Sequence, residues 1–149
     1  MKFLCLSILP LIFLASCSHQ LNIFNNSTST SINGINEHNY NEIENRKLTW
    51  NCIFFEANSP YYVYCYSLTC GHCASLKNSV IEYALNNENI YFYEDSKDTI
   101  LKGNVDDTFG VTSSKQLAIK GFPSLLKIED ETCILNIYGK EAISNELYL

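Results

Sequence analysis

Short apolar runs alternate with polar segments along the chain, and their spacing predicts strands and helices in turn. The run 61–66 is aromatic or β-branched on both faces, which is typical of a central strand that is covered on both sides. Leu76, Val80 and Ala84 then recur at helical spacing, and residues 90–93 predict a second strand, parallel to the first. This order predicts a βαβ unit whose helix packs on the sheet.

The residues after position 120 predict the other half of the sheet. Residues 125–128 and 133–138 are apolar runs that we expect to pair as a hairpin across Asp130-Glu131. Residues 140–148 follow as a closing helix. The sequence therefore predicts an α/β fold, in which a small mixed β-sheet is flanked by helices in the order βαβ and then ββα.

Three further segments have a less regular pattern. Residues 113–119 predict a short helix, and the polar residues 95–107 before them predict a loop or insertion. Near Thr49 two alternatives remain, a short helix that begins after Thr49 or an edge strand over residues 52–55.

The N-terminus has the pattern of an exported protein. Lys2 precedes the apolar residues 3–14, which are too few to span a bilayer comfortably but suit a signal peptide. The following Leu14-Ala15-Ser16-Cys17 resembles the bacterial lipoprotein box, in which the cysteine is lipidated and cleavage falls just before it. The resemblance implies that Cys17 carries lipid (a diacylglyceryl group, often with an added acyl chain such as palmitate) and anchors the protein on the extracytoplasmic face of a cell membrane. An ordinary cleaved signal with an incidental cysteine is the alternative.

Between this anchor and the apolar runs lies a polar segment. Residues 22–41 are rich in Asn, Ser and Thr and cannot bury enough apolar surface to offset the entropy of ordering. We therefore expect a signal peptide over residues 1–16, a lipidated Cys17 with a flexible spacer over 17–42, and one folded domain over 43–149. About a hundred residues suffice for one modest domain.

The charge disfavours nucleic acid as a partner. The chain has 10 basic and 16 acidic residues and a formal net charge of −6. Removal of residues 1–16 takes away one basic residue, Lys2, and leaves the mature chain near −7. Such a chain offers no basic surface to nucleic acid or to anionic lipid.

The segment Cys70-Gly71-His72-Cys73 carries the most distinctive chemistry, because it lies where the strand 61–66 gives way to a helix that begins near Cys73. Unpaired N–H groups at the helix start favour a thiolate on Cys70, and a protonated His72 adds positive charge. The pair therefore predicts thiol-disulfide exchange through a redox-active Cys70–Cys73 disulfide. A zinc site would need four ligands, and the chain has no second Cys-x-x-Cys or paired histidines, so we expect no metal and no other cofactor. A structural disulfide with so short a loop would stabilise little.

A second motif, Gly121-Phe122-Pro123, precedes the strand 125–128. The strand that leads into Cys-x-x-Cys, the Gly-x-Pro segment and the strands that end in Tyr138-Gly139 together resemble the thioredoxin family over roughly residues 45–149. The resemblance implies a thioredoxin-like fold, a cis bond before Pro123, and a substrate groove lined by Phe122 and Pro123. A plain strand-start proline is the alternative for Pro123.

Two positions refine the resemblance. Gly71-His72 resembles the inner dipeptide of disulfide isomerases, which favours the oxidising direction. Tyr64 stands where many family members have a buried acid that helps to move the proton of the second cysteine, Cys73. A water, the Tyr64 hydroxyl or an acid elsewhere are the alternatives for this role.

The other cysteines of the domain lie within apolar runs, where a small buried hydrophobe is the default. These are Cys52, Cys65 and Cys133. A Cys52–Cys133 bond, or a resolving role for Cys65, is the alternative.

The sequence thus predicts a membrane-anchored, extracytoplasmic thiol-disulfide oxidoreductase with protein thiols or disulfides as substrates, a membrane redox partner as a candidate and oxidation slightly favoured. One alternative is a reductase of the same fold. The other is a non-catalytic lipoprotein that binds a partner in a secretion or bacteriocin-export system.

Overall fold

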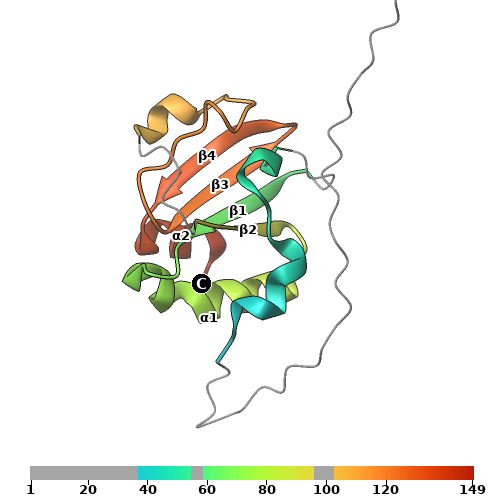
Figure 1. The fold of residues 1–149 in the computed structure, drawn as a ribbon, viewed down its shortest axis with the longest axis vertical. Coiled ribbons are helices and arrows are strands. Elements are labelled where there is room, and N and C mark those ends of the chain that lie inside the picture. The colour runs from blue at the N-terminus through green and yellow to red at the C-terminus, as the bar shows by residue number, and fades with distance from the viewer. Residues whose placement is uncertain (1–36, 55–58, 96–102) are drawn as a thin grey trace, which may run out of the picture.

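A four-stranded mixed sheet forms the centre of the molecule (Figure 1). The computed structural model describes residues 37–54, 59–95 and 103–149. β1 pairs in parallel with β2 and antiparallel with β3, which pairs antiparallel with β4. The predicted strands and hairpin are confirmed, in the spatial order β2-β1-β3-β4. The strands are β1 (Tyr61–Tyr66), β2 (Ile90–Glu94), β3 (Ser124–Glu129) and β4 (Thr132–Tyr138).

Helices cover one face of this sheet. α1 (Gly71–Asn86) connects β1 to β2, and α2 (Lys140–Leu147) follows β4. Figure 1 shows both on the same side of the strands, and their buried side chains form one apolar cluster with those of β1. The predicted α/β fold, with βαβ and ββα units in the thioredoxin-like order, is confirmed.

The side chains of β1 alternate between two cores. Tyr62, Tyr64 and Tyr66 contribute to the cluster under the helices, whereas Tyr61, Val63 and Cys65 contribute to a second cluster on the other face. Successive side chains of a strand point to opposite faces, so a strand covered on both sides is apolar throughout. Every residue of β1 except Tyr62 is buried, as predicted for a central strand.

The folded region begins before residue 43. A 3-10 helix, η1 (Tyr40–Arg46), packs against α1 and β2. The Tyr40 ring stacks on Tyr66 with 4.0 Å between ring centroids, and Ile43 is fully buried. Arg46 donates hydrogen bonds to carbonyls at the C-terminal end of α1. Residues 40–42 therefore belong to the domain and not to the flexible spacer that was predicted to reach residue 42.

The second face of the sheet is covered by short irregular segments. Near Thr49 the structure has a 3-10 helix, η2 (Trp50–Cys52), so the short-helix alternative is confirmed, although the Thr49 side chain makes no capping hydrogen bond. The edge strand considered over residues 52–55 is not formed at residues 52–54, and residue 55 lies outside the described residues. The Trp50 indole donates a 3.0 Å hydrogen bond to the Ser114 carbonyl, which holds η2 to the segment before β3.

The prediction of a helix over residues 113–119 is wrong. This segment forms a turn followed by extended chain, in which the alternate residues Leu117 and Ile119 are buried against the sheet. The Asn136 side chain of β4 donates to the Ala118 carbonyl at 2.7 Å, so a side chain from a distant strand satisfies a backbone group of this extended segment. Within the polar segment predicted as a loop, residues 105–108 form a 3-10 helix, η3 (Val105–Thr108), and residues 96–102 lie outside the described residues.

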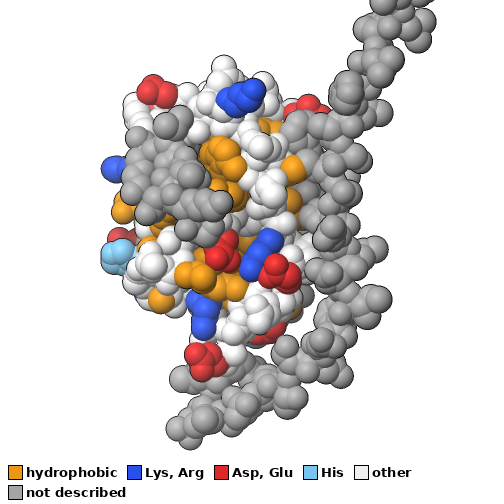
Figure 2. All heavy atoms as spheres, in the orientation of Figure 1, with side chains coloured by type: hydrophobic (Ala, Val, Ile, Leu, Met, Phe, Trp, Pro, Cys, Tyr) orange, Lys and Arg blue, Asp and Glu red, His pale blue; other side chains and the backbone are white. Residues whose placement is uncertain are grey.

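Charged side chains of both signs are interspersed on the face shown in Figure 2. The Lys47 ammonium lies 2.7 Å from the Glu44 carboxylate and 3.4 Å from that of Glu94. Among the residues that the structure describes, no helix is both long and apolar enough to cross a membrane. The segment predicted as a signal peptide, Cys17, and the predicted spacer up to residue 36 lie outside the described residues.

Candidate active site

Cys70 is the N-cap residue of α1, and Cys73 lies in the first turn. Cys70 has extended backbone, with φ −87° and ψ 114°, and its Sγ accepts a hydrogen bond from the Cys73 N–H at 3.2 Å. The sulfur thus occupies the place of the side-chain oxygen in an ordinary N-cap. The helix begins slightly earlier than predicted, because the first turn is already bonded back to the Cys70 carbonyl by the Ala74 N–H at 3.0 Å. A thiolate on Cys70 would be stabilised by this N–H and by the helix dipole.

The two thiols differ in accessibility. Cys70 is half-buried, whereas Cys73 is 1% exposed, and both are free thiols in this structure. Burial raises the pKa of Cys73 well above its usual range, and the hydrogen bond with Cys70 acts in the same direction. Cys70 is therefore the thiol that an incoming disulfide can reach, and Cys73 is the protected member of the pair.

The Phe122–Pro123 segment lies against the cysteine pair. The Cys70 thiol donates a 3.4 Å hydrogen bond to the Phe122 carbonyl. The Phe122–Pro123 peptide bond is cis, as the resemblance implied. Pro123 directly precedes β3, and β3 is the neighbour of β1, so sheet pairing brings together two motifs that are far apart in the sequence.

An open groove of about 480 Å³ runs past this segment. Gly121 lies at its edge, where an added Cβ would come within 2.8 Å of the Tyr138 ring, so a glycine is needed for the ring to lie there. The Lys120 ammonium lies 5.8 Å from the centre of the same ring. The groove adjoins the cysteine pair through Phe122, whose carbonyl accepts the Cys70 thiol. Its lining residues are His72, Phe122, Pro123, Tyr138, Gly139, Lys140, Glu141 and Ala142.

The structure brings five of the residues predicted for the site together. Cys70 and Cys73 adjoin Phe122, while His72 is exposed on the first turn of α1 and shares the groove with Phe122 and Pro123. The sixth, Cys17, lies outside the described residues.

Sequence reasoning missed the far wall of the groove, residues 138–142, and the side chain of Tyr40 beneath the helix. The wall could have been found, because β4 ends at Tyr138 beside Ser124, where β3 begins after Pro123. Tyr40 could have been found from its spacing of three residues to the apolar Ile43. These are the two residues of η1 that reach the core.

The remaining described thiols fit a passive role. Cys65 and Cys133 are both fully buried in the cluster on the sheet face away from α1. Burial raises the pKa of Cys65 strongly and that of Cys133 to about 11. Cys133 is a free thiol, so the Cys52–Cys133 bond considered above is not formed. The prediction of a passive buried thiol is wrong for Cys52, which is half-buried and disulfide-bonded. Cys65 points into the core opposite the one that holds Cys73, which disfavours a resolving role.

Within the described part of the chain, no cluster of three or more His, Cys, Asp or Glu side chains is arranged to hold a metal ion.

Comparison with known proteins gives a structural likeness only. No family model matches the sequence, and no curated protein gives a significant match. Among solved structures, thioredoxin f2 of Chlamydomonas reinhardtii is 17% identical, with 67% of this chain and 93% of that chain covered and a TM-score of 0.46. Oxidised mitochondrial thioredoxin 3 of Saccharomyces cerevisiae is 18% identical, with 73% and 96% covered and a TM-score of 0.47. The long form of spinach chloroplast thioredoxin f is 12% identical, with 68% and 82% covered and a TM-score of 0.47.

The strand order and the helix positions described above define the fold class of the protein. The chain has a thioredoxin-like fold that carries a Cys-x-x-Cys pair at the start of the helix after its central strand.

Proposed function

We propose that this protein is a thiol-disulfide oxidoreductase that exchanges disulfides with protein substrates through Cys70 and Cys73. The observation that carries the proposal is the position of Cys70. Its sulfur is half-exposed at a helix N-terminus, accepts the Cys73 N–H at 3.2 Å and lies 3.4 Å from the Phe122 carbonyl beside an open groove. Reactive cysteines are typically found in such partly exposed sites, where a thiolate is stabilised.

The exchange proceeds through a mixed disulfide. In the oxidising direction, a substrate thiolate attacks Cys70 of the Cys70–Cys73 disulfide and releases Cys73 as a thiolate, which takes up a proton. A second substrate thiol then attacks the substrate sulfur, so the substrate gains a disulfide and the protein keeps two thiols. The reducing direction reverses these steps, with Cys70 attacking first and Cys73 resolving.

We favour net oxidation because His72 lies on the first turn of α1, where the imidazole, when protonated, would stabilise the reduced, thiolate form. A stabilised reduced form makes the disulfide a stronger oxidant. The groove that His72 shares with Phe122 and Pro123 would hold the substrate as an extended chain.

We further propose that Cys17 is lipidated and holds the domain on the extracytoplasmic face of a cell membrane. The lipoprotein box in the sequence supports this location, and disulfides persist outside the cytoplasm. A protein that oxidises or reduces substrates repeatedly must itself be recycled, which makes a membrane redox protein the expected partner.

The reduction potential of the Cys70–Cys73 pair tests the function and its direction. The full-length protein is equilibrated with glutathione buffers, and the oxidised fraction is measured after acid quenching and thiol alkylation. A potential of roughly −120 to −180 mV supports oxidation or isomerisation, and one near about −270 mV or below indicates the reductase alternative.

The double variant Cys70→Ser/Cys73→Ser is the matched control, because it keeps Cys65 and Cys133 and reports any exchange at those thiols. If the unchanged protein shows no more exchange than this variant, the proposed activity is wrong, and a lipoprotein that binds a partner without turnover becomes the better explanation.

A further inference from the structure

Two tyrosine hydroxyls are buried beneath the cysteine pair without a hydrogen-bond partner. The Tyr40 and Tyr64 hydroxyl oxygens are both inaccessible to solvent, and neither has a partner among the described residues. A buried hydroxyl without a partner is costly, so each one calls for an explanation, and a role in catalysis is one of the few available.

Both hydroxyls belong to the same core as Cys73. Tyr64 is fully buried on β1, on the face that packs against α1, and Cys73 is the first buried residue of α1 in that cluster. Tyr40 reaches the cluster from η1 by stacking on Tyr66. Strand β1, helix α1 and helix η1 thus direct two hydroxyls and one thiol into a single dry region.

These hydroxyls remain protonated donors. Burial raises the pKa of Tyr64 and of Tyr40 far above the usual range, and the neighbouring thiols Cys73 and Cys70 add to the increase. Neither tyrosine can therefore act as a base. A neutral hydroxyl can still stabilise a thiolate, because a charged acceptor forms a stronger hydrogen bond than a neutral one.

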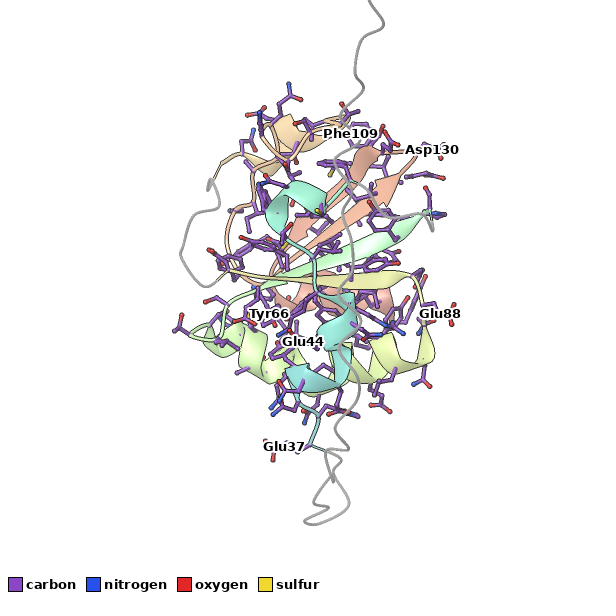
Figure 3. All side chains as sticks on the ribbon, turned by 45° about the vertical axis from the view of Figure 1, so that its right-hand side comes forward. Glu37, Glu44, Tyr66, Glu88, Phe109 and Asp130 are labelled. Atoms are coloured by element: carbon purple, nitrogen blue, oxygen red, sulfur yellow. The ribbon has the colours of Figure 1, made fainter. Side chains whose placement is uncertain are left out.

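Other titratable groups around this region are already engaged. The Tyr66 hydroxyl, shown in Figure 3 between the strands and the helices, donates to the Glu94 carboxylate at 2.9 Å. Glu94 also lies 3.4 Å from the Lys47 ammonium. Cys70 accepts the Cys73 N–H, and Cys65 points into the opposite core.

We propose that the Tyr40 and Tyr64 hydroxyls stabilise the Cys73 thiolate when Cys73 resolves the mixed disulfide, as neutral donors in place of a buried acid. This inference rests on the proposed function and concerns the reducing half of the exchange. Cys73 gives its proton to water and attacks the Cys70 sulfur, the bond between Cys70 and the substrate sulfur breaks, and the departing substrate thiolate takes up a proton from water. Two electrons pass from the cysteine pair to the substrate disulfide.

The test measures the resolution step by itself. The reduced full-length protein is mixed with glutathione disulfide, and acid-quenched samples are analysed by mass spectrometry for the Cys70–glutathione adduct and for the Cys70–Cys73 disulfide. The double variant Tyr40→Phe/Tyr64→Phe is expected to resolve the adduct about tenfold more slowly or worse, since a hydrogen bond to a charged group is lost. The midpoint of the resolution rate against pH should move upward, while the rate of adduct formation at Cys70 stays unchanged.

Tyr66→Phe is the matched control, because it removes a hydroxyl from the same ring stack that bonds to Glu94 and not to the thiols. It should resolve the adduct at a rate within about twofold of the unchanged protein. Equal resolution rates for the double variant and the unchanged protein overturn the inference. Slow resolution in Tyr66→Phe also overturns it, because the proton route would then run through Glu94.

The stability of the double variant distinguishes a role in resolution from a structural role of the two hydroxyls. Loss of two unpartnered hydroxyls should leave the urea midpoint of unfolding unchanged or raise it. The inference is contradicted if the double variant unfolds at lower urea and its resolution rate falls in proportion to that loss of stability. The single variants Tyr40→Phe and Tyr64→Phe then show which hydroxyl is structural. If the unchanged protein forms no adduct at Cys70, the proposed function itself fails.

Discussion

At the scale of single residues, the site works by an asymmetry between two similar thiols. Cys70 and Cys73 are separated by two residues, yet the helix start leaves one half-exposed and buries the other. The hydrogen bond between the two residues has one direction, since the Cys73 N–H donates to the Cys70 sulfur. In the proposed exchange, this difference in accessibility favours attack by Cys70 and resolution by Cys73.

This asymmetry predicts different outcomes for the two serine variants. Cys70→Ser should reduce exchange to the level of the double serine variant, because the free thiols that then remain among the described residues are buried. Cys73→Ser should accumulate a stable disulfide between Cys70 and substrate, which non-reducing gels and mass spectrometry would detect. Cys133→Ser is the control and should trap nothing, because Cys133 lies in the opposite core. A Cys70→Ser protein that exchanges at the unchanged rate would rule out the mechanism.

The cysteine pair and Phe122-Pro123 could be predicted because each is a local sequence signal, a motif at a predicted helix start and a proline before a strand. The groove wall at residues 138–142 and the position of Tyr40 were missed, because each signal gains its meaning only when one knows which strand ends and which helix meet in space. Tyr64 was noticed only as a departure from a family pattern. Its lack of a hydrogen-bond partner is a property of three-dimensional packing.

At the scale of elements, the β3–β4 hairpin closes through an unusual turn. Asp130 and Glu131 have φ of 47° and 58°, the left-handed region that non-glycine residues adopt at a cost. Such a turn matches the twist of the flanking strands and is normally made by Asn-Gly or Asp-Gly. The turn lies at the edge of the sheet in Figure 3, where Asp130 is labelled.

We therefore expect Glu131→Gly to raise the free energy of unfolding by about 1 kcal/mol, because glycine removes the strain of the left-handed backbone. Urea unfolding followed by the fluorescence of Trp50 measures the change. Glu129→Gly is the matched control, since it makes the same substitution at an exposed position of β3 in the same hairpin. It should lower stability by roughly 0.5–1 kcal/mol. A loss of stability in both variants would show that the turn is not strained.

The elements themselves were predictable where one periodicity dominated. The apolar run 133–138 and the helical spacing of Leu76, Val80 and Ala84 led to the correct strand and helix. The segment 113–119 was mispredicted because Leu117 and Ile119 are buried in an extended chain, and the hydrogen bond from Asn136 that favours this conformation comes from a distant strand. The helix η1 was missed because its polar composition resembles the spacer before it.

At the scale of the whole molecule, the two cores hold neutral groups that would ionise in the unfolded chain. Cys73 lies in one core, and Cys65 and Cys133 lie in the other. Burial raises the pKa of all three thiols above the ordinary value of 9.0, for Cys133 to about 11. Between these values the unfolded chain loses protons that the folded chain retains, so the free energy of unfolding falls as pH rises.

The reduced protein should therefore lose stability from about pH 9 upward, at up to about 1.4 kcal/mol per pH unit for each buried thiol. Urea unfolding at intervals from pH 7 to 10.5 measures the slope. Oxidation of Cys70 and Cys73 removes one titrating thiol of the first core and should make the slope shallower, and Cys133→Ser should do the same through the second core. A slope that depends on neither change would mean that the buried tyrosines, whose pKa burial also raises, dominate the alkaline response. A stability that does not change with pH would contradict the prediction. It would mean that the pKa of the thiols is the same in the folded and in the unfolded chain, in spite of their burial.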